Sequence, residues 1–266
     1  MVMENPPPPR PGESARPPEP AGRERPRLHD IPKGNTCRGV NRAIIEFLLG
    51  CGDDLGRARF LDIPCGPGAF MRTLRDFFPD ATVKGCDIHP PESLPASACT
   101  RVDASRPFTV FSETQFDVIT SISGVMEFDN TRQFFESCAA HLRENGRLIV
   151  TNDNLVSVRD RLAYLAFGKA RQFGLFPDPD KPTWKMIPVQ NLVRILYDAG
   201  FVVREIRYVS ARFKDWALLP LALLLWPGQL LYVRMSRSVL GARERAALFP
   251  FRSLICRHYI LVCAKR

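Results

Sequence analysis

A glycine-rich turn between an expected strand and an expected helix is the segment best suited to chemistry. Residues 59–68 read Arg-Phe-Leu-Asp-Ile-Pro-Cys-Gly-Pro-Gly, an apolar run that ends in Asp62 and breaks at Gly66 and Gly68. A helix-forming run over residues 69–78 follows at once. Glycine lets the backbone approach a ligand closely, and the free N–H groups of a helix start can donate to that ligand. The turn therefore predicts a nucleotide-binding cradle.

Further polar residues are expected at the same edge of the sheet. A second strand ends in Asp87, 19 residues after the last glycine of the turn. That spacing is normal for a βαβ unit whose acidic residue binds a ribose. A short strand over 99–104 carries Asp103, and a fourth strand runs over 116–122. Because open α/β sheets bind ligands outside the carboxyl ends of their strands, these residues predict one ligand site.

This order of residues resembles the class I S-adenosylmethionine-dependent methyltransferases, whose first motif is usually Asp, three residues, then Gly-x-Gly. The resemblance covers residues 40–155 well and the rest more loosely. It implies an α/β fold: a Rossmann-like seven-stranded sheet with helices on both faces and a late antiparallel hairpin, here with helical insertions. It also implies S-adenosyl-L-methionine as the cofactor. The residues that it assigns to cofactor binding are Asp62, Pro64, Cys65, Gly66, Gly68, Asp87, Ile88, Asp103, Ala104 and Ser121.

Other uses of such a fold fit the sequence less well. A dinucleotide fingerprint needs a third glycine, and Met71 stands at that position. A nucleic-acid methyltransferase would need an Asn/Asp-Pro-Pro-aromatic motif after the fourth strand, and the segment from Ser121 reads Ser-Ile-Ser-Gly. No nucleic acid is therefore expected as a partner. A non-catalytic membrane adaptor that kept the fold stays open as an alternative.

Catalytic groups are hard to find in the sequence. Glu127 follows the fourth strand, where many relatives carry Glu-His, but here Phe128 comes next. Glu127 is thus only a weak candidate for a base, and His141 reads as structural. Methyl transfer that depends mainly on proximity needs no strong base. The eight cysteines lack CxxC or Cys/His metal spacing, so we expect no metal site.

The chain divides into a tail and one domain. Residues 1–32 hold ten of the 24 prolines and few large apolar residues, so we expect 1–35 to be a disordered tail. The methyltransferase domain is then 36–266. Within it, the aromatic and proline-rich stretch 153–187 is expected to form an acceptor lid, and 210–254 is a hydrophobic, basic insertion. No apolar secretory signal is visible, which favours a reduced, cytoplasmic protein.

Most of the excess positive charge lies in the last quarter of the chain, which includes the insertion. Residues 201–266 carry 12 Lys/Arg against three Asp/Glu, whereas 41–200 carry 18 against 20. The insertion also contains 18 uncharged residues, 216–233, in which Pro220 and the break at Pro227 argue against a straight transmembrane helix. The alternatives are a helical pair packed on the core, a dimer interface, or a re-entrant or interfacial hairpin that contacts a membrane surface through 212–237.

Together these features predict an S-adenosylmethionine-dependent methyltransferase that acts on an amphiphilic small molecule, a glycolipid or a lipid-linked glycan. The alternatives are a methyltransferase of a soluble metabolite or natural product, or a non-catalytic membrane-associated protein. The expected location is cytoplasmic, either free or peripheral on the inner face of the membrane. The acceptor atom and the oligomeric state stay open at this point.

Overall fold

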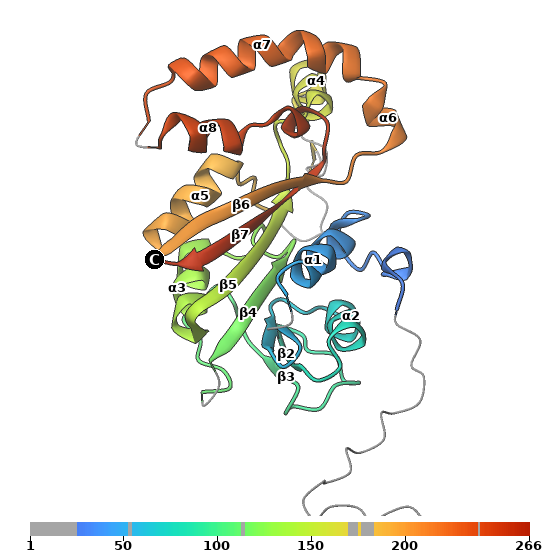
Figure 1. Ribbon diagram of the computed structural model, residues 1–266, viewed down its shortest axis with the longest axis vertical. Helices are drawn as coiled ribbons and strands as arrows, with labels where there is room; N and C mark the ends of the chain where they lie inside the picture. Colours follow the sequence, from blue (N-terminus) through green and yellow to red (C-terminus); the bar gives the residue numbers. More distant parts are fainter. Residues whose placement is uncertain (1–25, 53–54, 113–114, 170–174, 177–183, 239) are drawn as a thin grey trace, which may run out of the picture.

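A seven-stranded sheet runs through the molecule in the order β3-β2-β1-β4-β5-β7-β6 (Figure 1). The pairs from β3 to β5 are parallel, whereas β7 runs antiparallel to both of its neighbours. The predicted sheet with its late antiparallel hairpin is therefore confirmed. The strands are β1 (Arg59–Asp62), β2 (Thr82–Asp87), β3 (Cys99–Arg101), β4 (Phe116–Ile122), β5 (Leu142–Asp153), β6 (Phe201–Val209) and β7 (His258–Lys265). The computed structural model describes residues 26–52, 55–112, 115–169, 175–176, 184–238 and 240–266.

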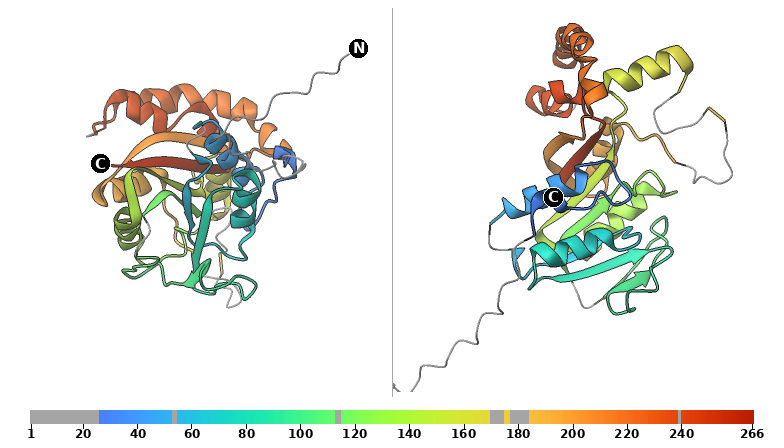
Figure 2. Two further views of the ribbon diagram at one scale, coloured as in Figure 1. Left: turned by 60° about the horizontal axis from the view of Figure 1, so that its bottom comes forward. Right: turned by 90° about the vertical axis from the view of Figure 1, so that its right-hand side faces the viewer.

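Helices cover both faces of this sheet (Figures 1 and 2). Successive side chains of a strand point to opposite faces, so Phe60 packs in one hydrophobic cluster and Leu61 in the other. Side-chain caps start two of the helices: Asn130 Oδ1 accepts the N–H of Gln133 at 3.0 Å, and Ser157 caps the helix that follows β5. The helices on the Phe60 face are α1 (Val40–Leu49) and α2 (Ala69–Phe77), and those on the Leu61 face are α3 (Thr131–His141) and α5 (Val189–Asp198).

The domain begins earlier than the predicted boundary at residue 36. Residues 28–30 form a short 3-10 helix, and Leu28 and Ile31 pack against the cluster on the α1 face. The Asn41 side chain donates to the carbonyls of Pro32 and Lys33 at 3.0 and 3.2 Å. Residues 26–35 are therefore part of the packed domain, because α1 gives them both an apolar partner and hydrogen bonds. The rest of the predicted tail, 1–25, lies outside the described residues.

The insertion forms a helical layer beyond the carboxyl edge of the sheet (Figures 1 and 2). Its members pack with α4 around Val158, Ala222, Leu254 and Ile255. The α4 helix ends at Gly168, while most of the expected lid beyond it, 170–174 and 177–183, lies outside the described residues. The helices of this layer are α4 (Val158–Phe167), α6 (Phe213–Trp216), α7 (Leu219–Met235), α8 (Ala242–Leu248) and the 3-10 helix η3 (Phe251–Leu254).

The expected helix break at Pro227 is wrong. The α7 helix runs through Pro227, while Pro220 stands in its first turn, where proline is tolerated. Proline removes the hydrogen bond to the carbonyl four residues earlier, here that of Leu223. Leu223 is 56% exposed, so water can bond this carbonyl and the helix can continue. Among the described residues, no helix has both the length and the apolar character needed to cross a membrane.

A buried ion pair joins this helical layer to the sheet. Asp215 of α6 accepts two hydrogen bonds, both of 2.6 Å, from the guanidinium of Arg257, which directly precedes β7. Arg159 of α4 is 3.3 Å from the same carboxylate, and the backbone N–H of Arg212 donates to it at 2.8 Å. Burial by itself would raise the pKa of Asp215, but the bonds from Arg257, Arg212 and Arg159 outweigh it and lower the pKa. Asp215 is therefore ionised, and its pair with Arg257 holds α6 against the edge of the sheet.

We predict that Asp215→Asn lowers the free energy of unfolding by about 3–5 kcal/mol near neutral pH, because the buried Arg257 loses the carboxylate that accepts two of its hydrogen bonds. Urea denaturation followed by circular dichroism measures this loss. The matched control Glu46→Gln removes an exposed pair with Arg42 on α1 and should cost at most about 0.5 kcal/mol. Equal losses in the two variants would contradict the role of the buried pair.

The pH dependence of that difference has a defined sign. The folded protein lowers the pKa of Asp215, so its contribution is fully present above the unfolded pKa of about 3.9. It is lost as the pH falls through the lower, folded pKa. The stability difference between the wild-type protein and Asp215→Asn should therefore shrink only in acid.

Candidate active site

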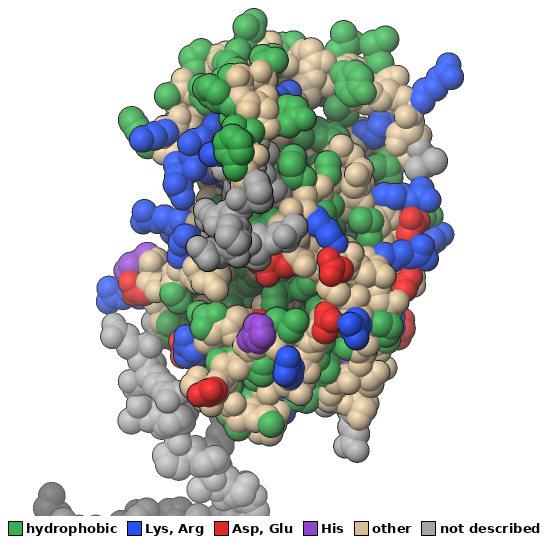
Figure 3. Space-filling model, turned by 180° about the vertical axis from the view of Figure 1, so that it is seen from behind, with side chains coloured by type: hydrophobic (Ala, Val, Ile, Leu, Met, Phe, Trp, Pro, Cys, Tyr) green, Lys and Arg blue, Asp and Glu red, His purple; other side chains and the backbone are tan. Residues whose placement is uncertain are grey.

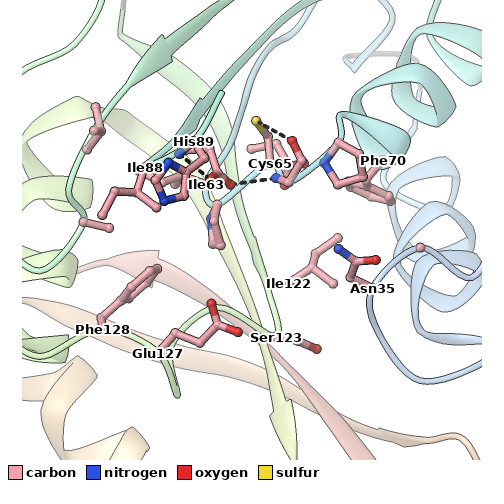
Figure 4. A pocket seen from close by; sticks show the side chains of 18 of the residues that line it. Asn35, Ile63, Cys65, Phe70, Ile88, His89, Ile122, Ser123, Glu127 and Phe128 are labelled. Atoms are coloured by element: carbon pink, nitrogen blue, oxygen red, sulfur yellow. Dashed lines mark hydrogen bonds between the residues drawn. The ribbon is translucent and has the colours of Figure 1, made fainter. Parts of the chain in front are cut away.

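A cavity of about 720 Å³ lies at the carboxyl edge of the sheet, where the strands β1, β2 and β4 end (Figure 4). Apolar side chains such as Ile88, Phe70 and Phe128 form part of its wall, and carboxylates reach it from several elements. Eight of the ten residues that the sequence assigned to cofactor binding line this cavity, namely Asp62, Pro64, Cys65, Gly66, Asp87, Ile88, Asp103 and Ala104.

The Asp87 carboxylate holds the glycine turn in place. Its Oδ2 accepts the backbone N–H of Gly66 at 2.8 Å, and its Oδ1 accepts that of His89 at 2.9 Å (Figure 4). Gly66 and Gly68 have φ angles of +50° and +73°, which side chains disfavour, so the turn needs glycine there. The end of β2 and the turn after β1 are therefore bonded together at the rim of the cavity.

Asp62 is a buried acid at the end of β1. It is 2% exposed, and its Oδ1 accepts the hydroxyl of Thr120 at 2.7 Å. Burial raises the pKa of Asp62 to about 7; the bond from Thr120 lowers it, and the nearby Asp87 raises it further. A cationic group placed beside Asp62 would favour its ionised form. The cavity thus offers a carboxylate that responds to the charge of its ligand.

Two of the residues assigned to cofactor binding, Gly68 and Ser121, lie outside the described wall of the cavity. Gly68 caps α2, and a Cβ added to it would lie 3.0 Å from Leu94, so the turn itself needs glycine there. Ser121 is fully buried within β4, and Ile122 and Ser123 line the cavity at this strand end. The assignment of Gly68 and Ser121 to the cofactor stays a prediction.

A second cavity, of about 350 Å³, adjoins the first. The two share Asn35, Thr36, Ser123 and Glu127 as lining residues. In Figure 4 the Glu127 carboxylate points into the first cavity. Burial raises the pKa of Glu127, against a 3.1 Å hydrogen bond from the Trp184 indole that lowers it. The residues found only in the second cavity are Lys33, Cys37, Met126, Asp153, Trp184, Arg212, Arg257 and His258.

Sequence reasoning missed a polar cluster that faces this second cavity. His258 Nδ1 lies 3.1 Å from Asp153 Oδ1, and its Nε2 lies 3.4 Å from Ser123 Oγ. The Ser123 hydroxyl lies 2.7 Å from that of Thr36. Ser123 has a φ of +57°, a strained value that is often found at functional sites. The sequence shows His258 near the end of the chain, but its partners depend on the pairing of β7 with β5.

Cys37 stands beside this pair. Cys37, Asp153 and His258 each bring one atom able to bind a metal, and these atoms lie within 4.8 Å of one another. Asp153 Oδ1 and the Nδ1 of His258 lie within hydrogen-bond distance of each other, at 3.1 Å. We therefore interpret the cluster as a histidine oriented by a carboxylate, with a thiol next to it.

The first cavity has the chemistry that a ribonucleoside with a cationic tail requires. Carboxylates at the ends of β2 and β3, Asp87 and Asp103, can accept hydrogen bonds from hydroxyl and amino groups. Ile88 and Val102 offer apolar surface for a base, and Asp62 can pair with a cation. These side chains come from neighbouring strands, and the glycine turn leaves the backbone open to the ligand.

Comparison with known proteins agrees with this geometry. The sequence profile of a family described as a methyltransferase domain matches residues 36–206. None of the curated proteins matches the sequence. Similar solved structures include the PH0226 protein from Pyrococcus horikoshii OT3, with a TM-score of 0.50 and 16% identity over 84% of this chain and 88% of that chain.

Two further similar structures are known methyltransferases. One is an S-adenosylmethionine-dependent methyltransferase from Clostridium acetobutylicum ATCC 824, with a TM-score of 0.49 and 11% identity over 85% of this chain and 90% of that chain. The other is geranyl diphosphate methyltransferase in complex with S-adenosylmethionine, with a TM-score of 0.46 and 15% identity over 84% of this chain and 85% of that chain. At such identities the likeness concerns the fold alone. Because the family profile covers more than half of the chain, the protein belongs to the class I S-adenosylmethionine-dependent methyltransferases.

Proposed function

We propose that the protein methylates an amphiphilic acceptor, a glycolipid or a lipid-linked glycan, while it rests on the cytoplasmic surface of a membrane. One observation carries this proposal: the helical layer that contributes Arg212 to the second cavity also exposes a broad apolar surface. An acceptor whose apolar part stays in the membrane could then present its polar part to the site. The acceptor class and the membrane contact thus rest on the same surface.

The apolar surface spans three helices. Leu165 of α4 is 85% exposed and Phe213 of α6 is 91% exposed, which is unusual for side chains of this size. Figure 3 shows hydrophobic side chains over the end of the molecule that carries α7. The apolar residues of α4, α6 and α7 with at least half of their surface exposed are Tyr164, Leu165, Phe167, Phe213, Trp216, Leu223, Leu224, Leu231, Tyr232 and Met235.

Positive charge flanks this surface. The exposed basic residues of the same layer include Lys214 beside Phe213 on α6, Arg234 on α7 and Arg243 on α8. A basic residue near an anionic leaflet contributes about 1 kcal/mol to binding. Exposed leucines and aromatic rings contribute more when they enter the headgroup region. Apolar side chains with basic flanks fit an anionic membrane surface better than they fit a neutral protein partner.

Residues of the first cavity supply what the cofactor needs. When bound, S-adenosylmethionine provides an electrophilic methyl group on a sulfonium. Asp87 would accept hydrogen bonds from the ribose hydroxyls and Asp103 from the adenine amine, with Ile88 and Ala104 beside the base. Asp62 would pair with the cationic end. The remaining task of the protein is to hold an acceptor in line and to exclude water.

Glu127 lies where that acceptor would enter. It lines both cavities, and its hydrogen bond from Trp184 joins the wall of the second cavity to the rim of the first. Burial raises its pKa, and the hydrogen bond from Trp184 opposes this effect. Glu127 is therefore placed to contact the acceptor, and we keep it as a candidate that orients the acceptor.

We predict that Asp87→Ala weakens S-adenosylmethionine binding by more than about tenfold, because two charge-assisted hydrogen bonds to the ribose are worth more than about 1.4 kcal/mol. Isothermal titration calorimetry measures the affinity, and thermal melting checks the fold. The control Asp80→Ala changes an exposed aspartate in the turn before β2 and should leave the affinity unchanged. Normal affinity in Asp87→Ala would refute the ribose assignment.

A second prediction concerns pH. The pKa of Asp62 is about 7, and a cation beside it binds to the ionised form. Below that pH the site must first release a proton, so the affinity for S-adenosylmethionine should fall by up to about tenfold per pH unit. Calorimetry from about pH 5 to about pH 7 tests the slope. Asp62→Asn should bind more weakly and without this slope, and an unchanged slope in that variant would assign it to another group.

A third prediction tests the membrane contact. The protein should sediment with vesicles of phosphatidylcholine that contain about a third phosphatidylglycerol, and less as salt rises. Leu224→Asp with Leu231→Asp should reduce the bound fraction about tenfold or more, since both side chains are exposed on α7. The control pair Leu49→Asp with Tyr197→Asp changes exposed apolar residues of α1 and α5 and should bind as the wild-type protein does.

Two results would contradict the membrane contact. One is equal sedimentation of both double variants. The other is a dimer in size-exclusion chromatography that the α7 variant alone dissociates, which would assign the apolar surface to self-association. Either result would leave the assignment of the cofactor site unaffected, because Leu224 and Leu231 lie outside both cavities.

A further inference from the structure

The second cavity is lined by His258, a histidine that the proposed cofactor site does not include. His258 is the first residue of β7, is 1% exposed, and lines the second cavity but not the described wall of the first. Its Nδ1 lies 3.1 Å from Asp153 Oδ1. A carboxylate can only accept a hydrogen bond, so Nδ1 carries the proton and Nε2 keeps its lone pair. In the neutral ring, Nε2 is therefore the basic nitrogen, and the bond from Nδ1 to Asp153 fixes its direction.

That nitrogen faces the boundary between the two cavities. Nε2 lies 3.4 Å from Ser123 Oγ, and the Ser123 hydroxyl lies 2.7 Å from Thr36 Oγ1. Ser123 and Thr36 line both cavities. Nε2 and these two hydroxyls therefore lie near the boundary where the two cavities adjoin.

We propose that His258, positioned by Asp153, is the general base that takes the proton of an acceptor hydroxyl bound in the second cavity. This inference rests on the proposed methyl transfer and names the acceptor as an alcohol or phenol. The O–H proton moves to Nε2, and the acceptor oxygen forms a bond to the methyl carbon. The carbon–sulfur bond breaks with its electron pair left on sulfur, so a neutral thioether and a protonated imidazole result.

A hydroxyl fits this arrangement better than an amine. A neutral amine attacks a methyl group without first losing a proton, whereas a hydroxyl is poorly nucleophilic until a base takes its proton. Met126 and Trp184 give the second cavity apolar and aromatic wall beside the polar cluster. The acceptor that fits carries its hydroxyl on a ring or another partly apolar body.

The groups around the ring raise the pKa of His258. Burial lowers the pKa of His258, but the hydrogen bonds with Asp153 and Cys37 outweigh this effect, and the pKa is raised above its usual value. Only the neutral ring can accept a proton, so the rate should rise with pH through this raised pKa. The titratable and charged groups that share the cavity are Lys33, Cys37, Glu127, Asp153, Arg212 and Arg257, the last of which is paired with Asp215.

The test uses the full-length protein with methyl-labelled S-adenosylmethionine and, as acceptor source, aqueous and organic-soluble extracts of the cells that make the protein. We expect His258→Gln to lower the labelling rate about 100-fold or more while S-adenosylmethionine affinity and thermal melting stay near wild type. Added imidazole should partly restore the rate of His258→Ala, because a small base can enter the space. The control His29→Gln, at a histidine that is 65% exposed, should label as the wild-type protein does.

The pH profile separates a base from a structural histidine. The wild-type rate should rise with pH, and His258→Gln should lose that rise. Asp153→Asn should label slowly and with a shifted profile, since the amide no longer fixes the tautomer. A wild-type rate and profile in His258→Gln would overturn the inference and leave the proposed function standing.

Two further outcomes would also overturn it. If His258→Gln loses S-adenosylmethionine affinity or melting temperature together with its rate, and imidazole restores nothing in His258→Ala, the residue is structural. If the wild-type protein binds S-adenosylmethionine but labels no fraction of either extract, the proposed function itself fails, and this inference fails with it.

Discussion

The antiparallel insertion of β7 between β5 and β6 is the constraint on which the acceptor side of this enzyme depends. It brings the first residue of β7 back to the edge where β1, β4 and β5 end, and its register pairs His258 with Asp153. Arg257, one residue earlier, then meets Asp215 of the insertion. One strand reversal therefore sets both the polar cluster of the second cavity and the attachment of the helical layer. A parallel β7 would place these two residues at the opposite edge.

The cofactor cavity depends on residues that lie closer together in the sequence. Parallel strands end at one edge, so Asp62, Asp87 and Asp103 meet there without any contribution from the last hundred or so residues of the chain. Asp87 does two jobs, because it fixes the glycine turn through the N–H of Gly66 and stands in the cavity wall. Burial raises the pKa of Asp62 to about 7, so a cationic ligand beside it would change its charge near neutral pH. The ionisation of Asp62 can therefore respond to the positive charge of the cofactor.

The insertion connects these sites to the exterior. It contributes Arg212 to the second cavity, Asp215 to the buried pair and a run of exposed leucines to the surface. Exposing large apolar side chains to water lowers solubility and does not stabilise the fold, so such a surface needs a purpose. An amphiphilic acceptor held at a membrane would give one. On that proposal, the second cavity and the apolar surface belong to one functional unit.

Much of this protein could be predicted from its sequence, because local spacing decides it. The strand that ends in Asp62, the glycine turn and the acids Asp87 and Asp103 follow from periodicity and turn chemistry within a few tens of residues. The arrangement of helices on both faces came from the resemblance to the methyltransferase family. Tertiary structure alone decided the rest. At the end of β4, Ile122 and Ser123 line the cavity, whereas Ser121 is buried within the strand. The partners of His258 lie 105 and 135 residues away, because strand pairing and not spacing joins them.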